Sequence, residues 1–323
     1  MEKTDILVVY PSLSSFIERD IQLLRERYSI ATLQYDKRRN RADLLLELRR
    51  CRLAFAWFAL GYAYPMVRIG MFRGIPTALV AGGYDVESIP ELGYGAMTRG
   101  VRRQRTRFAL ANATRVLSVS NFTKGRVLYW CPSANVRVIY HGFPSAPSPQ
   151  VTKREETVVT VANVRRSTWR LKGLDTFLEV ARRIPDASFH IIGRIDEDPG
   201  RFGPAIPPNL HVRGWMPHDR LLELFGRSKV YAQLSYVESF GCALAEAMSR
   251  GCQPVVTNRG ALPEVVGDVT TPVPYGDVDE AEQAVRKGLA REGSTEARDW
   301  IDNHFPISDR RRRLYALFQE LLP

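Results

Sequence analysis

The sequence predicts an α/β fold built from two doubly wound domains, each a parallel sheet with helices on both faces. Short apolar, β-branched runs alternate with helix-favouring segments along the whole chain, which is the order typical of parallel sheets. With 323 residues, the chain is long enough for two domains that each have a core. A proline- and serine-rich stretch at 142–150 interrupts the alternation and predicts a connector between them.

The first domain is expected over residues 1–145. Its longest uncharged run, 53–67, is shorter than the roughly 20 apolar residues of a membrane span and is interrupted by Gly61 and Pro65. It therefore predicts a buried strand that enters a helix. Apolar runs of strand length predict further strands, with helices between them, near 5–9, 29–33, 53–58, 77–80, 115–119 and 136–139.

The second domain is expected over residues 151–305, and the chain ends in an amphipathic helix at 306–323. Runs rich in β-branched residues predict strands near 157–161, 188–192, 209–213, 230–234 and 254–257. Segments with helical periodicity predict helices near 174–183, 219–225, 242–250, 262–266 and 278–290.

The positive charge of the chain is confined to its first half. Residues 1–150 hold 22 Lys and Arg against 11 Asp and Glu, whereas residues 151–323 hold 24 against 24, so the whole excess of +11 lies before position 151. Only this half is expected to seek anionic partners.

The densest basic run, 99–107, predicts a helix with a thin apolar stripe. Met97, Val101, Gln104 and Phe108 fall on one side, and arginines occupy the other faces. Three interpretations are open: a solvated helix packed by its stripe, a surface for anionic lipid headgroups, or a nucleic-acid contact. No recognised binding motif accompanies the charge, so we expect no nucleic-acid partner.

The most informative stretch is a strand, a turn and a helix between positions 230 and 251. Residues 230–234 predict a short buried strand, and the alanine-rich segment 242–250 predicts a helix. Gly241 lies in the turn and lets a ligand approach the backbone closely. Glu238 lies at the strand end, and Glu246 lies about one turn inside the helix.

The start of this helix predicts a phosphate site. A helix N-terminus offers unsatisfied N–H groups and a partial positive charge, which suit a phosphate or diphosphate. The two carboxylates, roughly 12 Å apart if every step were helical, are expected to accept hydroxyls from two parts of one ligand. Such a ligand is a sugar nucleotide. The expected donor-binding backbone comprises Ser239, Phe240, Gly241, Cys242 and Ala243.

Two segments, 158–194 and 212–268, resemble the donor domain of the family 4 retaining glycosyltransferases with the GT-B fold. The resemblance implies two Rossmann-like domains that face a central cleft, with the terminal helix 306–323 packing back on the first. It also implies that Glu238 and Glu246 are the ends of an E-x7-E motif. In the family, the first glutamate contacts sugar hydroxyls and the second contacts the ribose.

The resemblance further implies a cationic residue at Lys172, directly before Gly173. A leaving nucleoside diphosphate gains negative charge, and a fixed cation stabilises it without a metal. An arginine is expected to assist. Arg165, Arg166 and Arg170 could each reach the diphosphate, and we favour Arg166, then Arg170; a solvated basic loop is the alternative.

Three further regions carry candidate residues. Arg194 is expected near the base of the nucleotide, which does not distinguish uracil from guanine. The resemblance implies a histidine or an acidic residue after a strand of the first domain, close to the reacting sugar. Asp85 is the candidate, as a polar contact to the sugar or a base toward the acceptor, unless it only caps a turn. Ser14 and Ser15 belong to the loop after the first strand, which is expected to approach the phosphates or the acceptor.

No metal or other cofactor is expected. Asp277 and Asp279 form a D-x-D pair, but they lie directly before a helix, where acidic residues cap the N-terminus and complement the dipole. The five histidines show no ligand spacing.

Together these features predict a metal-independent, retaining glycosyltransferase that moves a sugar from a nucleoside-diphosphate donor to a hydroxyl acceptor, lipid-linked or on a glycan. A nucleotide-sugar epimerase of similar architecture and a non-catalytic membrane or partner-binding protein are the alternatives. The chain begins with a strand and shows no leader, and its cysteines lack C-x-x-C spacing. We expect a cytoplasmic protein with buried cysteines that can lie on the anionic inner face of the membrane.

Overall fold

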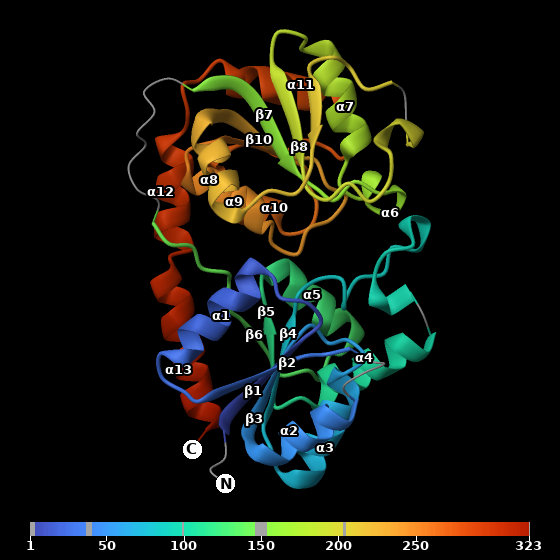
Figure 1. The fold of residues 1–323 in the computed structure, drawn as a ribbon, viewed down its shortest axis with the longest axis vertical. Coiled ribbons are helices and arrows are strands. Elements are labelled where there is room, and N and C mark those ends of the chain that lie inside the picture. Colours follow the sequence, from blue (N-terminus) through green and yellow to red (C-terminus); the bar gives the residue numbers. More distant parts are fainter. Residues whose placement is uncertain (1–3, 37–40, 99, 146–153, 203–204, 323) are drawn as a thin grey trace. The chain divides into compact units, whose positions relative to one another are not determined.

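A computed structural model shows two compact units, each with its own parallel sheet (Figure 1). Unit 1 comprises Met1–Gly142 and Ser308–Pro323, and unit 2 comprises Phe143–Ile307. The predicted α/β class is confirmed in both units. The structure describes residues 4–36, 41–98, 100–145, 154–202 and 205–322.

The sheet of unit 1 has six parallel strands in the order β2-β1-β3-β4-β5-β6. The strands are β1 (Thr4–Tyr10), β2 (Ile30–Gln34), β3 (Cys51–Trp57), β4 (Thr77–Ala81), β5 (Arg115–Ser118) and β6 (Val136–Val138). The helices are α1 (Ser15–Arg25), α2 (Arg41–Arg50), α3 (Ala63–Arg73), α4 (Gly100–Asn112), α5 (Asn121–Trp130) and α13 (Ile307–Leu321), with short 3-10 turns η1 (Pro90–Leu92) and η2 (Ala96–Thr98).

The central strands of this sheet, β1, β3 and β4, are largely buried on both faces and carry apolar side chains on both sides. Successive side chains of a strand point to opposite faces. Leu7 and Val9 join the core beneath α2, α3, α4 and α5. On the opposite face, Phe55 of β3 meets Phe318 of α13, with ring centroids 5.2 Å apart. The uncharged run at 53–67 is therefore a core strand that leads into α3, as predicted.

A buried ion pair holds α13 against α1 in unit 1, and the two helices lie side by side in Figure 1. Arg310 donates from Nε and Nη2 to the two carboxylate oxygens of Asp20, each at 2.6 Å. Its Nη1 donates to the carbonyls of Ile139 and Tyr140. Both charged side chains are almost fully buried. The last helix of the chain thus belongs to unit 1.

The sheet of unit 2 has five parallel strands in the order β11-β10-β7-β8-β9. The strands are β7 (Glu155–Val161), β8 (Ser188–Ile192), β9 (Leu210–Arg213), β10 (Ser228–Gln233) and β11 (Gln253–Val256). The helices are α6 (Arg166–Trp169), α7 (Leu174–Arg183), α8 (His218–Arg227), α9 (Cys242–Ser249), α10 (Leu262–Val266), α11 (Val278–Leu289) and α12 (Thr295–His304), with 3-10 turns η3 (Pro199–Arg201) and η4 (Gly267–Val269).

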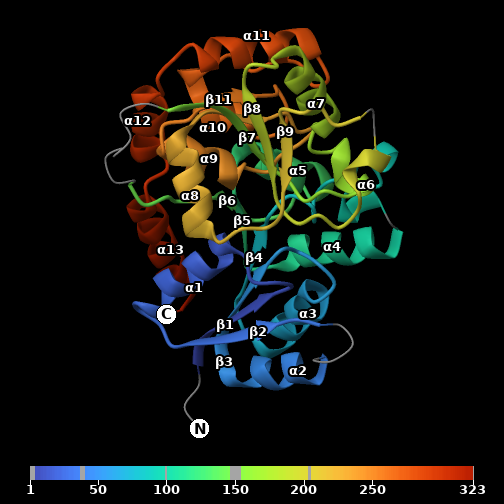
Figure 2. The ribbon, with the colours of Figure 1, turned by 45° about the horizontal axis from the view of Figure 1, so that its top comes forward.

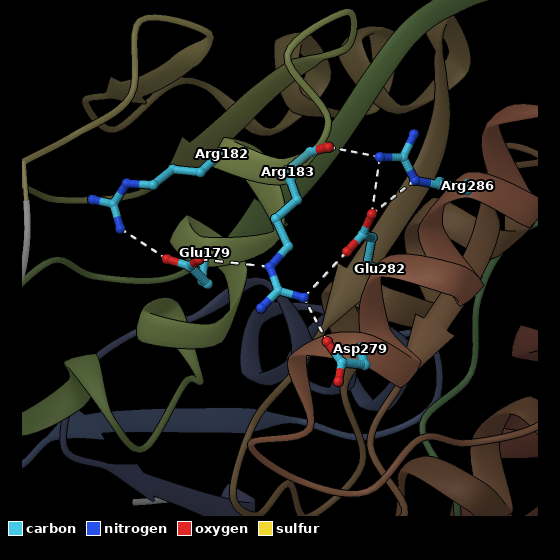
Figure 3. A network of polar contacts seen from close by, with 6 residues as sticks. All are labelled: Glu179, Arg182, Arg183, Asp279, Glu282 and Arg286. Atoms are coloured by element: carbon cyan, nitrogen blue, oxygen red, sulfur yellow. Dashed lines mark hydrogen bonds and ion pairs between the residues drawn. The ribbon is translucent and has the colours of Figure 1, made fainter.

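Helices α7 and α11 pack on each other, while α8 and α9 form another packed pair (Figure 2). Charged side chains link α7 to α11 along their exposed edges (Figure 3). Arg183 lies 2.5 Å from Asp279 and 3.3 Å from Glu282, and Arg286 lies 2.9 Å from Glu282. Asp277 accepts a hydrogen bond from the Glu280 amide at the start of α11, so the predicted cap is confirmed.

The predicted stripe on the basic helix is wrong for Val101 and Gln104, which are exposed, whereas Phe108 packs against the core as predicted. Val101 is 65% exposed, and α4 instead buries Thr106, Ala109 and Leu110. The reason lies in where the helix begins. Met97 belongs to the preceding turn η2 and is buried there, so it is not part of α4.

Two helices were not predicted. The loop expected around Arg166 contains the single turn α6, which is anchored by the buried Trp169. Helix α12 is capped by Ser294, whose side chain accepts a hydrogen bond from the Ala297 amide. No helix among the described residues combines the length and apolar character needed to cross a membrane.

Candidate active site

The carboxyl end of β10 in unit 2 holds the ion pair of Lys172 and Glu238. The Lys172 Nζ lies 2.6 Å from Glu238 Oε1, with both side chains only partly exposed. Gly173 follows with a left-handed φ of 64°, and a Cβ there would lie 1.9 Å from the Leu234 carbonyl oxygen. The Tyr236 amide also donates to the Leu171 carbonyl at 2.8 Å. Lys172 is therefore fixed to the end of β10 by the backbone on both sides of it.

Buried polar side chains orient Glu238. Gln233 Nε2 and Ser235 Oγ donate to Glu238 Oε1 at 3.0 and 2.8 Å, the same oxygen that Lys172 contacts. Tyr231 in turn donates to Gln233 Oε1 at 2.9 Å. None of the described residues donates to the other carboxylate oxygen, Oε2. Because three donors converge on Oε1, the carboxylate is held in one orientation and Oε2 can accept from a ligand.

The turn between Glu238 and α9 is anchored by an aromatic cluster. Phe240 is buried, and its ring centroid lies 5.9 Å from that of Phe143 and 5.3 Å from that of Phe305. Gly241 adopts a left-handed φ of 96° and is the N-cap of α9. Phe240 was predicted to bind the donor; with its ring buried in this cluster, only its backbone is placed to do so.

The backbone beside Glu238 is closely packed. Gly260 has a φ of 63°, and a Cβ there would lie 2.3 Å from the Glu238 carbonyl oxygen. The Ala261 amide donates to that same carbonyl at 2.8 Å. Glu238 is therefore fixed through its backbone as well as through its side chain.

The first residues of α9 form a partly exposed surface at the positive end of the helix dipole. Ser239, Gly241, Cys242 and Ala243 are all half-buried. Cys242 is the exception to the predicted burial of the four cysteines, because its position at the start of α9 faces partly outward. This helix start therefore has the partial exposure that a phosphate-binding backbone needs.

Glu246 lies one turn inside α9, as predicted, and its side chain is 10% exposed. Its Oε2 is 3.1 Å from Nε2 of His218, the first residue of α8. The helices α8 and α9 thus present a carboxylate and an imidazole to each other.

The basic loop before Lys172 is exposed. Its contacts do not indicate which of the three candidate arginines would bind the diphosphate. The side chains of Arg165, Arg166 and Arg170 are all exposed, and none forms an ion pair with a carboxylate in the described part of the chain. Arg194 is exposed as well, and its amide donates to Asn163 Oδ1 at 3.1 Å. Asn163 therefore ties the loop after β8 to the loop that carries these arginines.

The structure contradicts an active-site role for Asp85, which is fully buried in unit 1. Its Oδ2 accepts from the Ala59 amide at 2.8 Å, and its Oδ1 accepts from the Gly82 and Gly83 amides at 3.1 and 2.9 Å. A carboxylate enclosed in this way contacts neither a sugar nor an acceptor. Of the two predicted alternatives, the turn cap describes Asp85, because its carboxylate ties the loops after β3 and β4 together.

The burial of Asp85 makes the stability of the folded chain depend on pH. Desolvation raises the pKa of Asp85 to about 6 despite its backbone hydrogen bonds. The folded state therefore holds more protons than the unfolded chain between pH about 4 and about 6, and its stability falls as the pH rises through this range. Urea unfolding should show a loss approaching about 3 kcal/mol from pH 4 to 7 that disappears in Asp85→Asn. The same slope in wild type and variant would contradict it, and Asp43→Asn, an exposed carboxylate on α2, is the control.

Ser14 and Ser15 lie at the start of α1, where Ser14 is the N-cap in an extended conformation. Ser15 is exposed. The Ser14 side chain makes no capping hydrogen bond, and its buried Oγ has no hydrogen-bond partner among the described residues. This hydroxyl is therefore not used by the helix that it precedes.

Three further side chains belong to the site and were not predicted from the sequence, namely Gln233, Ser235 and His218. A signal existed for the first two, because Tyr231, Gln233 and Ser235 alternate along β10 and its end, and residues two apart share a face of a strand. No sequence signal indicated His218, which reaches Glu246 only through the packing of α8 on α9.

Solved structures share the fold of this chain. Sucrose-phosphate synthase from Thermosynechococcus elongatus superimposes with a TM-score of 0.75 at 13% identity, and the match covers 99% of each chain. Anabaena HepE, in a complex with UDP-glucose, gives a TM-score of 0.75 at 13% identity over 98% of this chain and 100% of that one. The chain therefore has the two-domain α/β fold of the GT-B glycosyltransferases.

Residues 146–304 match the family described as glycosyl transferases group 1. The resemblance seen in the sequence is thus confirmed at the level of a group 1 glycosyltransferase domain. One curated relative belongs to the phosphatidylinositol N-acetylglucosaminyltransferase of Arabidopsis thaliana. It is 26% identical over 196 residues, which are 57% of this chain and 43% of that protein. The chain spans less than half the length of this curated relative.

Proposed function

We propose that this chain is a family 4 retaining glycosyltransferase that transfers a sugar from a nucleoside-diphosphate donor to a hydroxyl acceptor without a metal. One observation carries the proposal. Within a group 1 glycosyltransferase domain, Lys172 and the oriented carboxylate of Glu238 lie in contact, at the end of β10 and just before α9. These residues supply a cation for a diphosphate and an acceptor for sugar hydroxyls at one strand end, where ligands of parallel sheets bind.

Each group has a part in the proposed reaction. Glu238 accepts hydrogen bonds from the donor sugar through Oε2, and Glu246 accepts from the ribose. The half-buried backbone of 239–243 binds the diphosphate with the help of the α9 dipole. Lys172, with Arg166 or Arg170, stabilises the charge that develops on the leaving diphosphate. The cation of Lys172 takes the place that a divalent ion has in metal-dependent transfer.

In the proposed reaction, bond breaking and bond formation take place on the same face of the sugar. The bond between the anomeric carbon and the diphosphate oxygen breaks, and a bond from that carbon to the acceptor oxygen forms on the same face. The acceptor hydroxyl proton passes to the leaving diphosphate oxygen. The same-face route keeps the configuration of the donor. We favour it over a double displacement because Lys172, Gln233 and Ser235 hold Glu238 through Oε1 in an orientation in which Oε2 accepts from the sugar hydroxyls.

The comparisons support a nucleotide-sugar donor. HepE is described in complexes with UDP-glucose and with UDP and glucose. The Arabidopsis relative is named for N-acetylglucosamine transfer to phosphatidylinositol. The basic excess of residues 1–150 supports, in addition, a location on the anionic inner face of a membrane.

The experiment tests donor, metal and stereochemistry in turn. UDP, GDP and their sugars are screened for a rise in Tm, and at least one is expected to stabilise the chain because binding to the folded state alone raises stability. Release of the nucleoside diphosphate is then followed with and without EDTA, and the anomer of the product is read by NMR. We expect EDTA to leave turnover unchanged and the product to keep the configuration of the donor.

Three results would count against the proposal in distinct ways. An unchanged Tm with every nucleotide would contradict the proposed donor site. Loss of turnover in EDTA would contradict metal independence. A product with the inverted anomeric configuration would contradict retention. Glu246→Ala is expected to weaken binding of the nucleotide, and Glu264→Ala serves as a matched control outside α9.

A further inference from the structure

Unit 1 contains a cavity of about 1240 Å³ between α3 and α4, here called the α3–α4 pocket. The two helices pack on each other (Figure 2). Residues that follow β1, β2, β3 and β4 line it, namely Pro11, Tyr35, Leu60 and Tyr84. The pocket therefore opens at the carboxyl ends of these strands, the edge at which parallel sheets bind ligands. None of its lining residues belongs to the donor half of the proposed site.

The walls of the pocket are largely apolar and aromatic. Tyr35 and Tyr62 lie against each other with ring centroids 5.2 Å apart, and Ile69 lines the pocket beside them. Phe72 and Val101 also line it, although they are 92% and 65% exposed. Large apolar side chains left in water at the edge of a pocket indicate an apolar ligand or surface.

Three arginines line the same pocket without a carboxylate partner. Arg68, Arg102 and Arg105 form no ion pair with any described residue. The guanidinium carbons of Arg68 and Arg105 lie 5.5 and 5.8 Å from the centroid of one ring, that of Tyr64. Arg102 donates to the Tyr84 hydroxyl at 3.0 Å. Each guanidinium has five N–H donors, so most of them remain for a ligand.

The charge around the pocket favours an anion. Because Arg68 and Arg105 lie near the same ring, their positive charges add at this wall of the pocket and attract an anion. The described lining of the pocket contains no acidic residue, and the sequence has no Asp or Glu from 101 to 150. The buried carboxylate of Asp85, which follows the lining residue Tyr84 in the chain, is engaged by the amides of Ala59, Gly82 and Gly83. Glu87 pairs with Arg126 at 3.2 Å.

We propose that the α3–α4 pocket binds an amphiphile in which a hydroxyl-bearing headgroup with an anionic phosphate is attached to an apolar chain, and that this amphiphile is the acceptor class. The acceptor role rests on the proposed transferase activity. A free anion would leave the apolar walls uncovered, and a neutral chain would leave three cations unpaired. The volume exceeds the 300–1,000 Å³ range of ordinary small-molecule pockets, which suits a chain as well as a headgroup.

The first experiment tests whether both the phosphate and the apolar chain of the ligand are needed for binding. Dodecyl phosphate, inorganic phosphate and the neutral dodecyl maltoside are titrated into the full chain below their aggregation concentrations, with binding measured by calorimetry. We expect dodecyl phosphate to bind at least about tenfold more tightly than either of the others, because only it meets the arginines and the apolar walls together. Equal affinity for inorganic phosphate or for the maltoside would overturn the proposal.

The second experiment locates the binding. Arg102→Gln and Phe72→Asp change exposed side chains, so the variants should fold, and each is expected to weaken dodecyl phosphate binding about tenfold. Arg103→Gln makes the same charge change on α4 but does not line the pocket, and should alter binding less than about twofold. If Arg103→Gln weakened binding as much as Arg102→Gln, the charge of the whole helix would be the cause, as on a membrane surface, and the pocket would be wrong.

Nucleotide binding, measured on the same variants, separates this proposal from the proposed function. Weak binding of dodecyl phosphate together with normal nucleotide binding would contradict the proposed amphiphile site in the α3–α4 pocket. It would not contradict the proposed transferase activity. Amphiphile binding with no nucleotide binding by the wild type would overturn the acceptor role. Competition by dodecyl phosphate against sugar transfer, lost in Arg102→Gln, would support it.

Discussion

Lys172→Ala is expected to lower kcat for sugar transfer by about 10²- to 10³-fold with a smaller change in the KM for the donor. The reason is that the charge on the leaving diphosphate grows as the glycosidic bond breaks, so the Lys172 cation acts more strongly in the transition state than on the bound donor. Steady-state kinetics with the donor found in the nucleotide screen would measure it. Lys287→Ala, an exposed lysine on α11, is the matched control and should keep the parent rate.

The contact between Lys172 and Glu238 makes the effects of the two residues interdependent. Glu238→Gln should also lower kcat strongly, since the carboxylate orients the sugar in the proposal. In a double-mutant cycle, the combined variant is expected to lose less than the sum of the two single losses, because the first substitution already removes the ion pair of 2.6 Å. Parent-like turnover by either single variant would show that the reaction does not use this pair.

Arg310→Ala should lower the free energy of unfolding of the chain by about 3 to 5 kcal/mol. The substitution leaves the Asp20 carboxylate, which is fully buried, without its cation, and it removes the donors to the carbonyls of Ile139 and Tyr140. Burying an unpaired charge is far more costly than losing a surface ion pair. Urea unfolding at neutral pH, followed by circular dichroism, would measure the change.

The same helix offers a control for this effect. Arg312 pairs with Asp309 on the surface of α13 and is 72% exposed, so Arg312→Ala should cost no more than about 1 kcal/mol. Replacing both buried partners, as in Asp20→Leu with Arg310→Met, should recover much of the stability because no buried charge is then left unpaired. Similar losses in Arg310→Ala and Arg312→Ala would mean that burial of the pair is not what stabilises α13.

The elements that the sequence predicted well are those whose signal is local. The strand 188–192 and the helices 174–183 and 262–266 match the structure residue for residue. Their patterns lie within single strands or helical turns, where side-chain periodicity decides the element. The basic helix was predicted correctly and is α4, but the predicted position of Val101 on its apolar side is wrong. A stripe drawn through Met97 assumed one continuous helix, whereas Met97 lies in η2 and α4 begins at Gly100.

The same difference between local and long-range signals applies to the residues of the candidate site. Glu238, Glu246 and the turn at Gly241 were predictable because a strand end, a glycine and a helix start follow one another in fewer than twenty residues. Asp85 was not, because its neighbours in sequence look like an exposed strand-end loop. Only the folded chain shows that the Ala59 amide, 26 residues away, encloses the carboxylate.

The sequence by itself determined the alternating α/β order, the two-domain division and the placement of two glutamates around a phosphate-sized turn. The tertiary structure decided which groups meet. Lys172 and Glu238 are 66 residues apart, and Arg310 and Asp20 are 290 apart. Periodicity and capping act over a few residues, whereas such contacts depend on how whole strands and helices pack, so no local pattern encodes them.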